Sequence, residues 1–238
     1  MNPTKLTALL RKAPATPPTP LPESVAARDP LASLVFAFLL WESTTAAACE
    51  AYARLERLAV DFNDLRVSLP SDVAAALGAR YPRAAERSMR LRAALNDIFR
   101  REHAVRLPAE RGGKRDIKAY VESLDGMVIP FVAARVLLLC YGVHGVPVDE
   151  RTRDVLAAAG ACEPTIDPLE CGHALARHVK AEQAEAAHSA LQAIVDAAPR
   201  ETGPTPRGKA PGARAAARSP AKASEQPSTT RRGKAAKG

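Results

Sequence analysis

The chain has 238 residues, of which 47% are hydrophobic and only 4% aromatic, a composition that favours helices over sheets in one domain with extensions. No run of eighteen apolar residues is present and the N-terminus lacks the apolar core of a signal peptide, so we expect no membrane span. The formal charge of +8 is unevenly distributed: residues 200–238 hold ten Lys or Arg against two Glu, whereas residues 30–199 hold twenty basic and twenty-two acidic side chains. The positive charge therefore belongs to the ends of the chain and does not by itself make the body a nucleic-acid binder.

Three segments are predicted. Residues 1–29 are interpreted as a flexible Pro-rich arm, because the run APATPPTPLP favours polyproline II. Residues 30–199 are predicted to fold into a helical body. Residues 200–238 contain no Leu, Ile, Val, Met or aromatic residue and are predicted to be a disordered basic tail. Such a tail favours binding to a polyanion through counterion release, and a merely solubilising tail is the alternative.

The first half of the body reads as helices joined by loops. Asp29-Pro30 is a helix-start signal, and the segment that follows, up to Trp41, is apolar nearly all round, which predicts a buried central helix. We interpret residues 61–70 and 108–113 as loops. The predicted helices are, in chain order, residues 30–41, 45–60, 72–78 (capped by Ser71), 83–102 and 114–124.

The helix at 83–102 is strongly amphipathic. Its apolar face carries Leu91, Ala94, Leu95, Ile98 and Phe99 at helical spacing. The other face is interpreted as a solvated one, and it carries Arg83, Arg87, Arg90, Arg100 and Arg101.

The stretch LDGMVIPFVAARVLLLCYGVHGVPVDER is the most informative one. A tight turn at Asp125-Gly126 precedes a helix that opens at Pro130 and ends at Gly142. After an extended linker, Asp149 stands where the next helix begins. A glycine turn that leads into a helix N-terminus presents free backbone N–H groups, which are suited to binding a phosphate.

The remaining body contains a helix closed by Gly160, one that starts with a capping box at Asp167 and Glu170, and a last helix that ends near Pro199. About eight helices and no convincing strand are predicted, so the fold class is all-α.

No metal site is expected from the cysteines or histidines. Cys49, Cys140, Cys162 and Cys171 lack tight ligand spacing, and we expect reduced thiols in a cytoplasmic protein. His173 and His178 are five residues apart on one predicted helix, which makes them poor partners for a metal ion.

The order of these elements resembles the helix–hairpin–helix (HhH-GPD) DNA glycosylases of the endonuclease III type over about residues 29–197. The segments LASLVFAFLLWESTTAA, LDGMVIPFVAARVLL and VPVDER carry the resemblance. It implies a two-lobed helical body that binds double-stranded DNA and flips a target base out of the duplex. The hairpin departs from the family pattern LPGVG-x-x-TA, because Asp125 replaces the proline and Val128 or Ile129 replaces the second glycine.

The resemblance also implies site residues. Gly126 matches the first hairpin glycine, so the backbone around Gly126, Met127 and Val128 would hold one DNA phosphate. Asp149 matches the catalytic aspartate, which stabilises the cationic sugar or helps to activate water. The alternatives are an ordinary helix connector and an ordinary N-cap. A basic set before the hairpin is expected to follow the DNA backbone, a solvated helix face being the alternative: Arg111, Lys114, Arg115 and Lys118.

Three departures from the family limit the chemistry. The lysine that forms a Schiff base in bifunctional members would lie near Phe131, and no lysine stands between Lys118 and Lys180, so we expect no AP-lyase activity. Only Cys162 and Cys171 stand where the family has four cluster cysteines, so we expect no iron–sulfur cluster and no other cofactor. At the junction where a glutamine often faces DNA, the chain has WEST, and a glutamate beside phosphates is unfavourable.

The sequence therefore predicts a DNA-binding protein of the base-excision-repair type. If it is an enzyme, we expect a monofunctional DNA glycosylase that hydrolyses the N-glycosidic bond of a damaged or mispaired base. The alternative is a catalytically inactive helical module that binds DNA or protein and is anchored to DNA by its basic tail. A third reading is a nucleoid-associated structural protein that depends on the tail. We expect a cytoplasmic, nucleoid-associated monomer.

Overall fold

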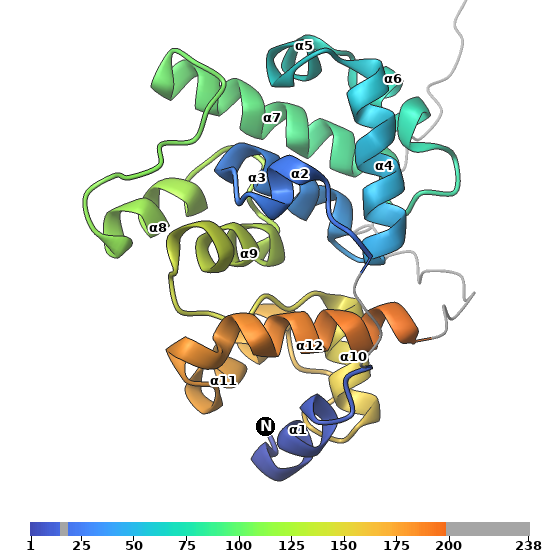
Figure 1. The fold of residues 1–238 in the computed structure, drawn as a ribbon, viewed down its shortest axis with the longest axis vertical. Helices are drawn as coiled ribbons and strands as arrows, with labels where there is room; N and C mark the ends of the chain where they lie inside the picture. Colours follow the sequence, from blue (N-terminus) through green and yellow to red (C-terminus); the bar gives the residue numbers. More distant parts are fainter. Residues whose placement is uncertain (15–18, 199–238) are drawn as a thin grey trace, which may run out of the picture. The chain divides into compact units, whose positions relative to one another are not determined.

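The computed structural model describes residues 1–14 and 19–198, and every regular element within them is helical, as the all-α prediction requires (Figure 1). The tail predicted for residues 200–238 lies outside the described residues. None of the helices in the described ranges is long and apolar enough to cross a membrane. In chain order the helices are α1 (Pro3–Leu10), α2 (Glu23–Ala26), α3 (Pro30–Leu40), α4 (Thr45–Leu58), α5 (Phe62–Val67), α6 (Pro70–Leu77), α7 (Ala84–Glu102), α8 (Lys114–Glu122), α9 (Pro130–Tyr141), α10 (Glu150–Ala158), α11 (Pro168–His178), the 3₁₀ turn η1 (Ala181–Gln183) and α12 (Ala184–Ala197).

Two hydrophobic cores divide residues 1–198 into two lobes. The first core is built from α2 to α9, and the second from α1, the linker after α9 and α10 to α12 (Figure 1). Helix α12 contacts α4 and α9 of the first lobe as well as α10 and α1 of the second. The chain therefore passes from one lobe to the other along the linker between α9 and α10, the stretch that carries Asp149.

Helix α3 is the centre of the first lobe. All its residues from Leu31 to Leu40 are buried, which agrees with the prediction from its apolar composition. The carboxylate of Asp29 accepts a hydrogen bond of 2.7 Å from the N–H of Ala32 and so caps the helix start. Helices α4, α7 and α9 pack around α3.

Residues 1–14 and 19–29 contain the helices α1 and α2, in contrast to the predicted flexible arm. Asn2 caps α1, its own N–H donates to the carbonyl of Ala161 at 2.7 Å, and Leu6 is buried in the second core. Val25 of α2 is likewise buried in the first core. The proline-rich composition concealed these contacts because single apolar residues such as Leu6 and Val25 anchor short helices without producing a long periodic pattern.

Other differences concern short helices and helix ends. The predicted loop 61–70 contains α5, which Asp61 caps by accepting the N–H of Asp64 at 2.8 Å. Helix α6 begins at Pro70, one residue before the predicted cap Ser71. The prediction for α9 is confirmed, since the helix begins at Pro130 and ends at Gly142 in the left-handed conformation.

Candidate functional site

Asp149 is the N-cap of α10 and is only 4% exposed. Its Oδ1 accepts hydrogen bonds from the N–H and the hydroxyl of Thr152, at 2.9 and 2.7 Å. Its Oδ2 accepts the main-chain N–H of Glu42 at 2.6 Å. Burial raises the pKa of the Asp149 carboxyl, and the hydrogen bonds from Thr152 and Glu42 oppose that rise. Asp149 thus caps its own helix and also ties the second lobe to the end of α3.

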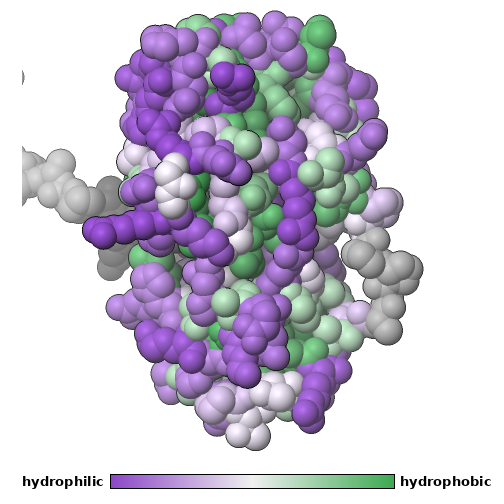
Figure 2. All heavy atoms as spheres, turned by 60° about the vertical axis from the view of Figure 1, so that its left-hand side comes forward, coloured by the Kyte–Doolittle hydropathy of each residue, from purple (hydrophilic) through white to green (hydrophobic). Residues whose placement is uncertain are grey.

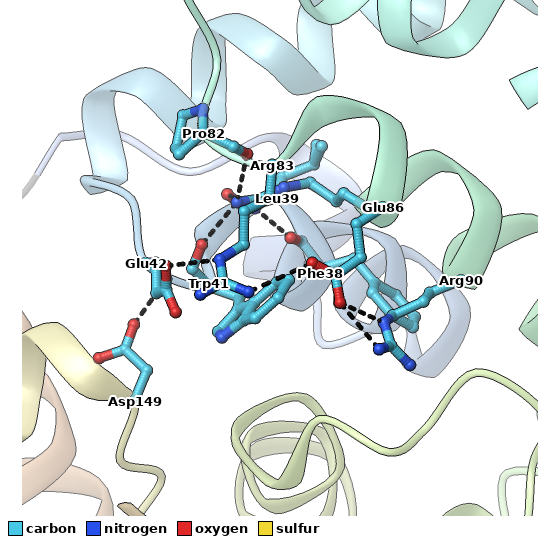
Figure 3. A network of polar contacts seen from close by, with 10 residues as sticks. Phe38, Leu39, Trp41, Glu42, Pro82, Arg83, Glu86, Arg90 and Asp149 are labelled. Atoms are coloured by element: carbon cyan, nitrogen blue, oxygen red, sulfur yellow. Dashed lines mark hydrogen bonds and ion pairs between the residues drawn. The ribbon is translucent and has the colours of Figure 1, made fainter. Parts of the chain in front are cut away.

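Glu42 follows α3 and has a left-handed backbone with φ of +51°. Its Oε2 accepts a hydrogen bond of 3.0 Å from Nε of Arg83 (Figure 3). Burial, and then the neighbouring carboxyl of Glu150, raise the pKa of Glu42 to about 7, while the charge of Arg83 opposes the rise. Three carboxyl groups therefore meet at this junction, those of Glu42, Asp149 and Glu150.

Arg83 continues the polar network away from the carboxyl groups. Its Nη1 donates to Glu86 at 3.2 Å, and Glu86 also accepts from Arg90 at 2.8 Å (Figure 3). The Arg83 guanidinium lies over the Trp41 ring, 4.9 Å from its centre. The backbone and side chains around Glu42 are thereby connected to α7.

Arg87 corrects the interpretation of α7 as having a wholly solvated arginine face. The side chain is fully buried and donates to the carbonyls of Phe38, Leu39, Trp41 and Pro82. The first three are carbonyls at the end of α3, where a helix leaves acceptors without intrahelical partners. The signal was present in the sequence, because Arg87 precedes Leu91 by four residues and so lies on the apolar face of α7.

The predicted hairpin turn packs against α7. Gly126 has φ of +83°, and a Cβ atom added there would lie 2.4 Å from the carbonyl oxygen of Arg90. The N–H of Asp125 donates to Asp97 of α7 at 2.9 Å. Packing on α7 therefore explains the glycine at this position without any phosphate.

The other two hairpin residues differ in exposure. Met127 is buried and its N–H donates to the carbonyl of Leu124 at 3.1 Å, whereas Val128 is 73% exposed. Within the described part of the chain, no hydrogen bond engages the N–H groups of Val128 and Ile129. The tip of the turn thus offers backbone donors to the outside.

The basic residues before the hairpin are mostly engaged within the protein. Lys114 donates to the carbonyl of Gly142 at 2.6 Å, and Lys118 pairs with Glu122 at 2.6 Å. Arg111 pairs with Glu102 at 2.6 Å. Arg115 is exposed and makes no ion pair among residues 1–14 and 19–198.

A groove of about 290 Å³ lies beside the hairpin, between α9, the linker and α11. Met127 and Lys118 both line it, as do Pro130 and Val148. Figure 2, which brings the left-hand side of Figure 1 forward, shows hydrophobic residues in the middle of this face between hydrophilic ones. Asp149 is not among the residues that line the groove. The predicted catalytic residue therefore lies outside the groove that borders the predicted phosphate-binding turn.

The cysteines offer no open ligand set. In the part of the chain that the structure describes, no group of three or more His, Cys, Asp or Glu residues is arranged to hold a metal ion. Cys162 and Cys171 are free thiols buried in the second core, where burial and the neighbouring thiol raise the pKa of Cys171 to about 12.

Comparison with known proteins identifies the fold. No protein-family model matches the sequence, and no curated protein sequence matches it. Among solved structures, a trapped endonuclease III–DNA covalent intermediate is similar, with a TM-score of 0.58 and 16% identity over 80% of this chain and 81% of that chain. A thermostable thymine-DNA glycosylase has a TM-score of 0.55 and 17% identity over 84% and 87% of the two chains. A non-covalent endonuclease III–DNA complex has a TM-score of 0.57 and 15% identity over 80% of each chain.

Proposed function

Because the chain has the HhH-GPD glycosylase fold, we propose that it is a double-stranded-DNA-binding protein of base-excision repair and a monofunctional DNA glycosylase. The observation that carries the proposal is the position of Asp149, a carboxylate at a helix N-cap that is contacted from the opposite lobe by the loop after α3. A nucleoid-associated monomer in the cytoplasm follows from this proposal.

In the proposed reaction, the Asp149 carboxylate stabilises the positive charge that develops on the sugar as the base departs. Glu42, whose pKa is raised to about 7, is assigned as the proton donor to the leaving base. The pairing of an ionised carboxylate with a neighbouring carboxyl of raised pKa is the pattern by which enzymes divide such roles between two acids. Because no lysine lies near Phe131, the attacking group is water and the sugar–phosphate backbone of the DNA is left uncut.

The catalytic carboxylate must first become accessible. Asp149 is covered because Glu42 hydrogen-bonds to its Oδ2. Glu42 has a left-handed backbone, which costs a non-glycine residue about 1 kcal/mol. The contacts of the loop after α3 must therefore hold it in this conformation. We propose that a flipped base breaks the hydrogen bond from the Glu42 N–H and uncovers Oδ2 of Asp149, while the carboxyl of Glu42 stays at the junction.

DNA would be held on the side of the hairpin. The free N–H groups of Val128 and Ile129 are suited to one phosphate, together with the backbone of Gly126 and Met127. Arg115 is the basic residue most available for a second phosphate. Lys114 and Lys118 would contribute only after releasing Gly142 and Glu122.

A single-turnover assay tests the proposal on duplexes that contain uracil, thymine opposite guanine, oxidised bases or alkylated bases. We expect strand cleavage that requires alkali after the reaction and that falls at least a hundredfold in Asp149→Asn. The matched control is Asp167→Asn, because Asp167 caps α11 in the same way but is remote from Glu42. Cleavage without alkali would contradict the absence of lyase activity, and excision that survives in Asp149→Asn would contradict the assigned carboxylate.

A second candidate is favoured by one observation, the occlusion of Asp149 with both carboxylate oxygens engaged. A helical DNA-binding module that has lost catalysis would keep Asp149 as a structural cap. Duplex binding without excision of any tested base, unchanged in Asp149→Asn, would establish this candidate. Loss of that binding on deletion of residues 200–238 would assign the affinity to the basic tail.

A further inference from the structure

Arg135 of α9 is buried at a cavity whose lining includes neither Asp149 nor the hairpin residues. The residue is 4% exposed, and its Nε and Nη1 atoms are buried without a hydrogen-bond partner among the described residues. The guanidinium lies over the ring of Phe36, 5.2 Å from its centre. A buried guanidinium with unused donors is costly to a fold, so it points to an anionic partner that residues 1–14 and 19–198 do not supply.

The acidic residues on the cavity wall do not neutralise Arg135. Glu185 pairs with Arg28, and no carboxylate of the described residues lies within ion-pair distance of Arg135. Burial lowers the pKa of Arg135 to about 10, which leaves the side chain charged at neutral pH. One positive charge therefore remains uncompensated inside the protein.

Asp196, the other acid of this cavity, is occupied as well. Its Oδ1 accepts the N–H of Thr45 at 2.9 Å and the side-chain amide of Gln192 at 2.9 Å. Its contacts thus tie α12 to the start of α4 and leave Arg135 unpaired.

The cavity is large enough for an organic molecule. It has a volume of about 640 Å³, within the range of small-molecule sites. Phe36, Leu40 and Leu139 supply apolar walls from α3 and α9. The opposite wall is α12, where His188 and Gln192 stand four residues apart and so share one helix face.

His188 contributes a neutral group. It is buried, and burial together with the charge of Arg135 lowers the pKa of its imidazole to about 3. The ring contacts Phe131 edge to face, with centroids 6.3 Å apart. A neutral imidazole has one N–H donor and one acceptor, so His188 adds polarity to the cavity without a second positive charge.

We propose that this cavity is a binding site for an organic monocarboxylate whose carboxylate pairs with Arg135 and whose hydrocarbon part packs on Phe36, Leu40 and Leu139. Planar guanidinium and carboxylate groups match through paired hydrogen bonds. A single negative charge balances Arg135, whereas a phosphate dianion would leave excess charge in an apolar cavity that also contains Glu185 and Asp196. The site is independent of the proposed glycosylase activity.

Isothermal titration calorimetry on the full chain tests the proposal with benzoate, 3-phenylpropionate and octanoate, each compared with its neutral amide. We expect at least one acid to bind at least tenfold more tightly than its amide. The same acid should lose at least tenfold in affinity in Arg135→Met, and should bind unchanged in Arg57→Met, a matched loss of an exposed arginine.

The proposal would be overturned by equal binding of acids and amides, by retention of acid binding in Arg135→Met, or by binding of inorganic phosphate more tightly than any of the acids. Failure of all three acids to bind at millimolar concentration would also overturn it. If Arg135→Met does not fold, the comparison of acid with amide on the wild-type chain decides alone.

Discussion

The main-chain N–H of Glu42 donates a 2.6 Å hydrogen bond to Oδ2 of Asp149, two residues that stand 107 positions apart in the chain. The bond places the loop after α3 over the N-terminus of α10, so the two lobes are joined at the carboxylate that we propose to be catalytic. The same contact that covers Asp149 brings the carboxyl of Glu42 beside it. The stability of this junction and the availability of Asp149 should therefore be coupled.

Asp149→Asn should destabilise the protein by about 1–3 kcal/mol. The amide oxygen can accept from Thr152 or from Glu42 but not from both, so one buried N–H loses its acceptor. Urea unfolding at neutral pH measures the change. Asp167→Asn is the control and should cost only a few tenths of a kcal/mol, because Asp167 accepts a single N–H at an exposed helix start. Equal losses in both variants would show that the contact with Glu42 contributes nothing.

Glu42→Gln should alter the pH dependence of stability. The folded pKa of Glu42 is raised from 4.5 to about 7 by burial and by Glu150, against the charge of Arg83, with a smaller rise from Asp149. The folded state then binds more protons than the unfolded state between these values, so the contribution of Glu42 to stability falls as pH rises from about 4.5 to 7. Relative to wild type, the variant should gain on the order of 2 kcal/mol across that window.

Chemical denaturation of both proteins at several pH values measures this difference, and Glu86→Gln provides a control of opposite sign. The pKa of Glu86 is lowered: burial would raise it, but hydrogen bonds from Arg90 and Arg83 outweigh that effect. Its stabilising contribution is therefore lost as pH falls below its unfolded value. A pH-independent difference between wild type and Glu42→Gln would mean that Glu42 titrates normally.

Arg87→Met should lower the free energy of unfolding by about 3–5 kcal/mol. The substitution leaves the buried carbonyls of Phe38 and Trp41 without the Arg87 donor, whereas the carbonyl of Leu39 keeps the hydroxyl of Tyr81. Arg90→Met is the control on the same helix and should cost less than about 1 kcal/mol, because Arg90 makes a partly exposed pair with Glu86. Thermal unfolding followed by circular dichroism compares the two, and similar melting temperatures would refute the capping role of Arg87.

Gly126→Ala should destabilise the hairpin turn by about 2–4 kcal/mol. The added methyl group meets the carbonyl oxygen of Arg90 in a backbone conformation that non-glycine residues avoid. Gly145→Ala is the control, since nothing lies within 4 Å of the position its Cβ would take. Hydrogen exchange of the α7 and α8 amides should show faster opening only in Gly126→Ala. If both variants are equally stable, the turn is free to shift away from α7.

The local structure of this protein could be predicted where a signal spans a few neighbouring residues. Pro130 and Gly142 delimit α9, and Asp149 caps α10, because helix-terminal preferences depend on backbone groups close in the sequence. The order of these elements was also sufficient to identify the fold that the solved structures confirm. The short helix α5 was not predicted, because such helices depend on packing against distant residues for their stability.

The sequence by itself determined most of the helices, their order and the position of Asp149 at a helix N-cap, because these depend on periodicity and on caps. Only the tertiary structure decided what surrounds each group. It placed the Glu42 N–H on Asp149, buried Arg87 against the end of α3, and left Arg135 without a partner in its cavity. Contacts between residues that are a hundred positions apart depend on how lobes pack, and packing determines burial, pKa and unsatisfied hydrogen bonds, none of which a short sequence pattern encodes.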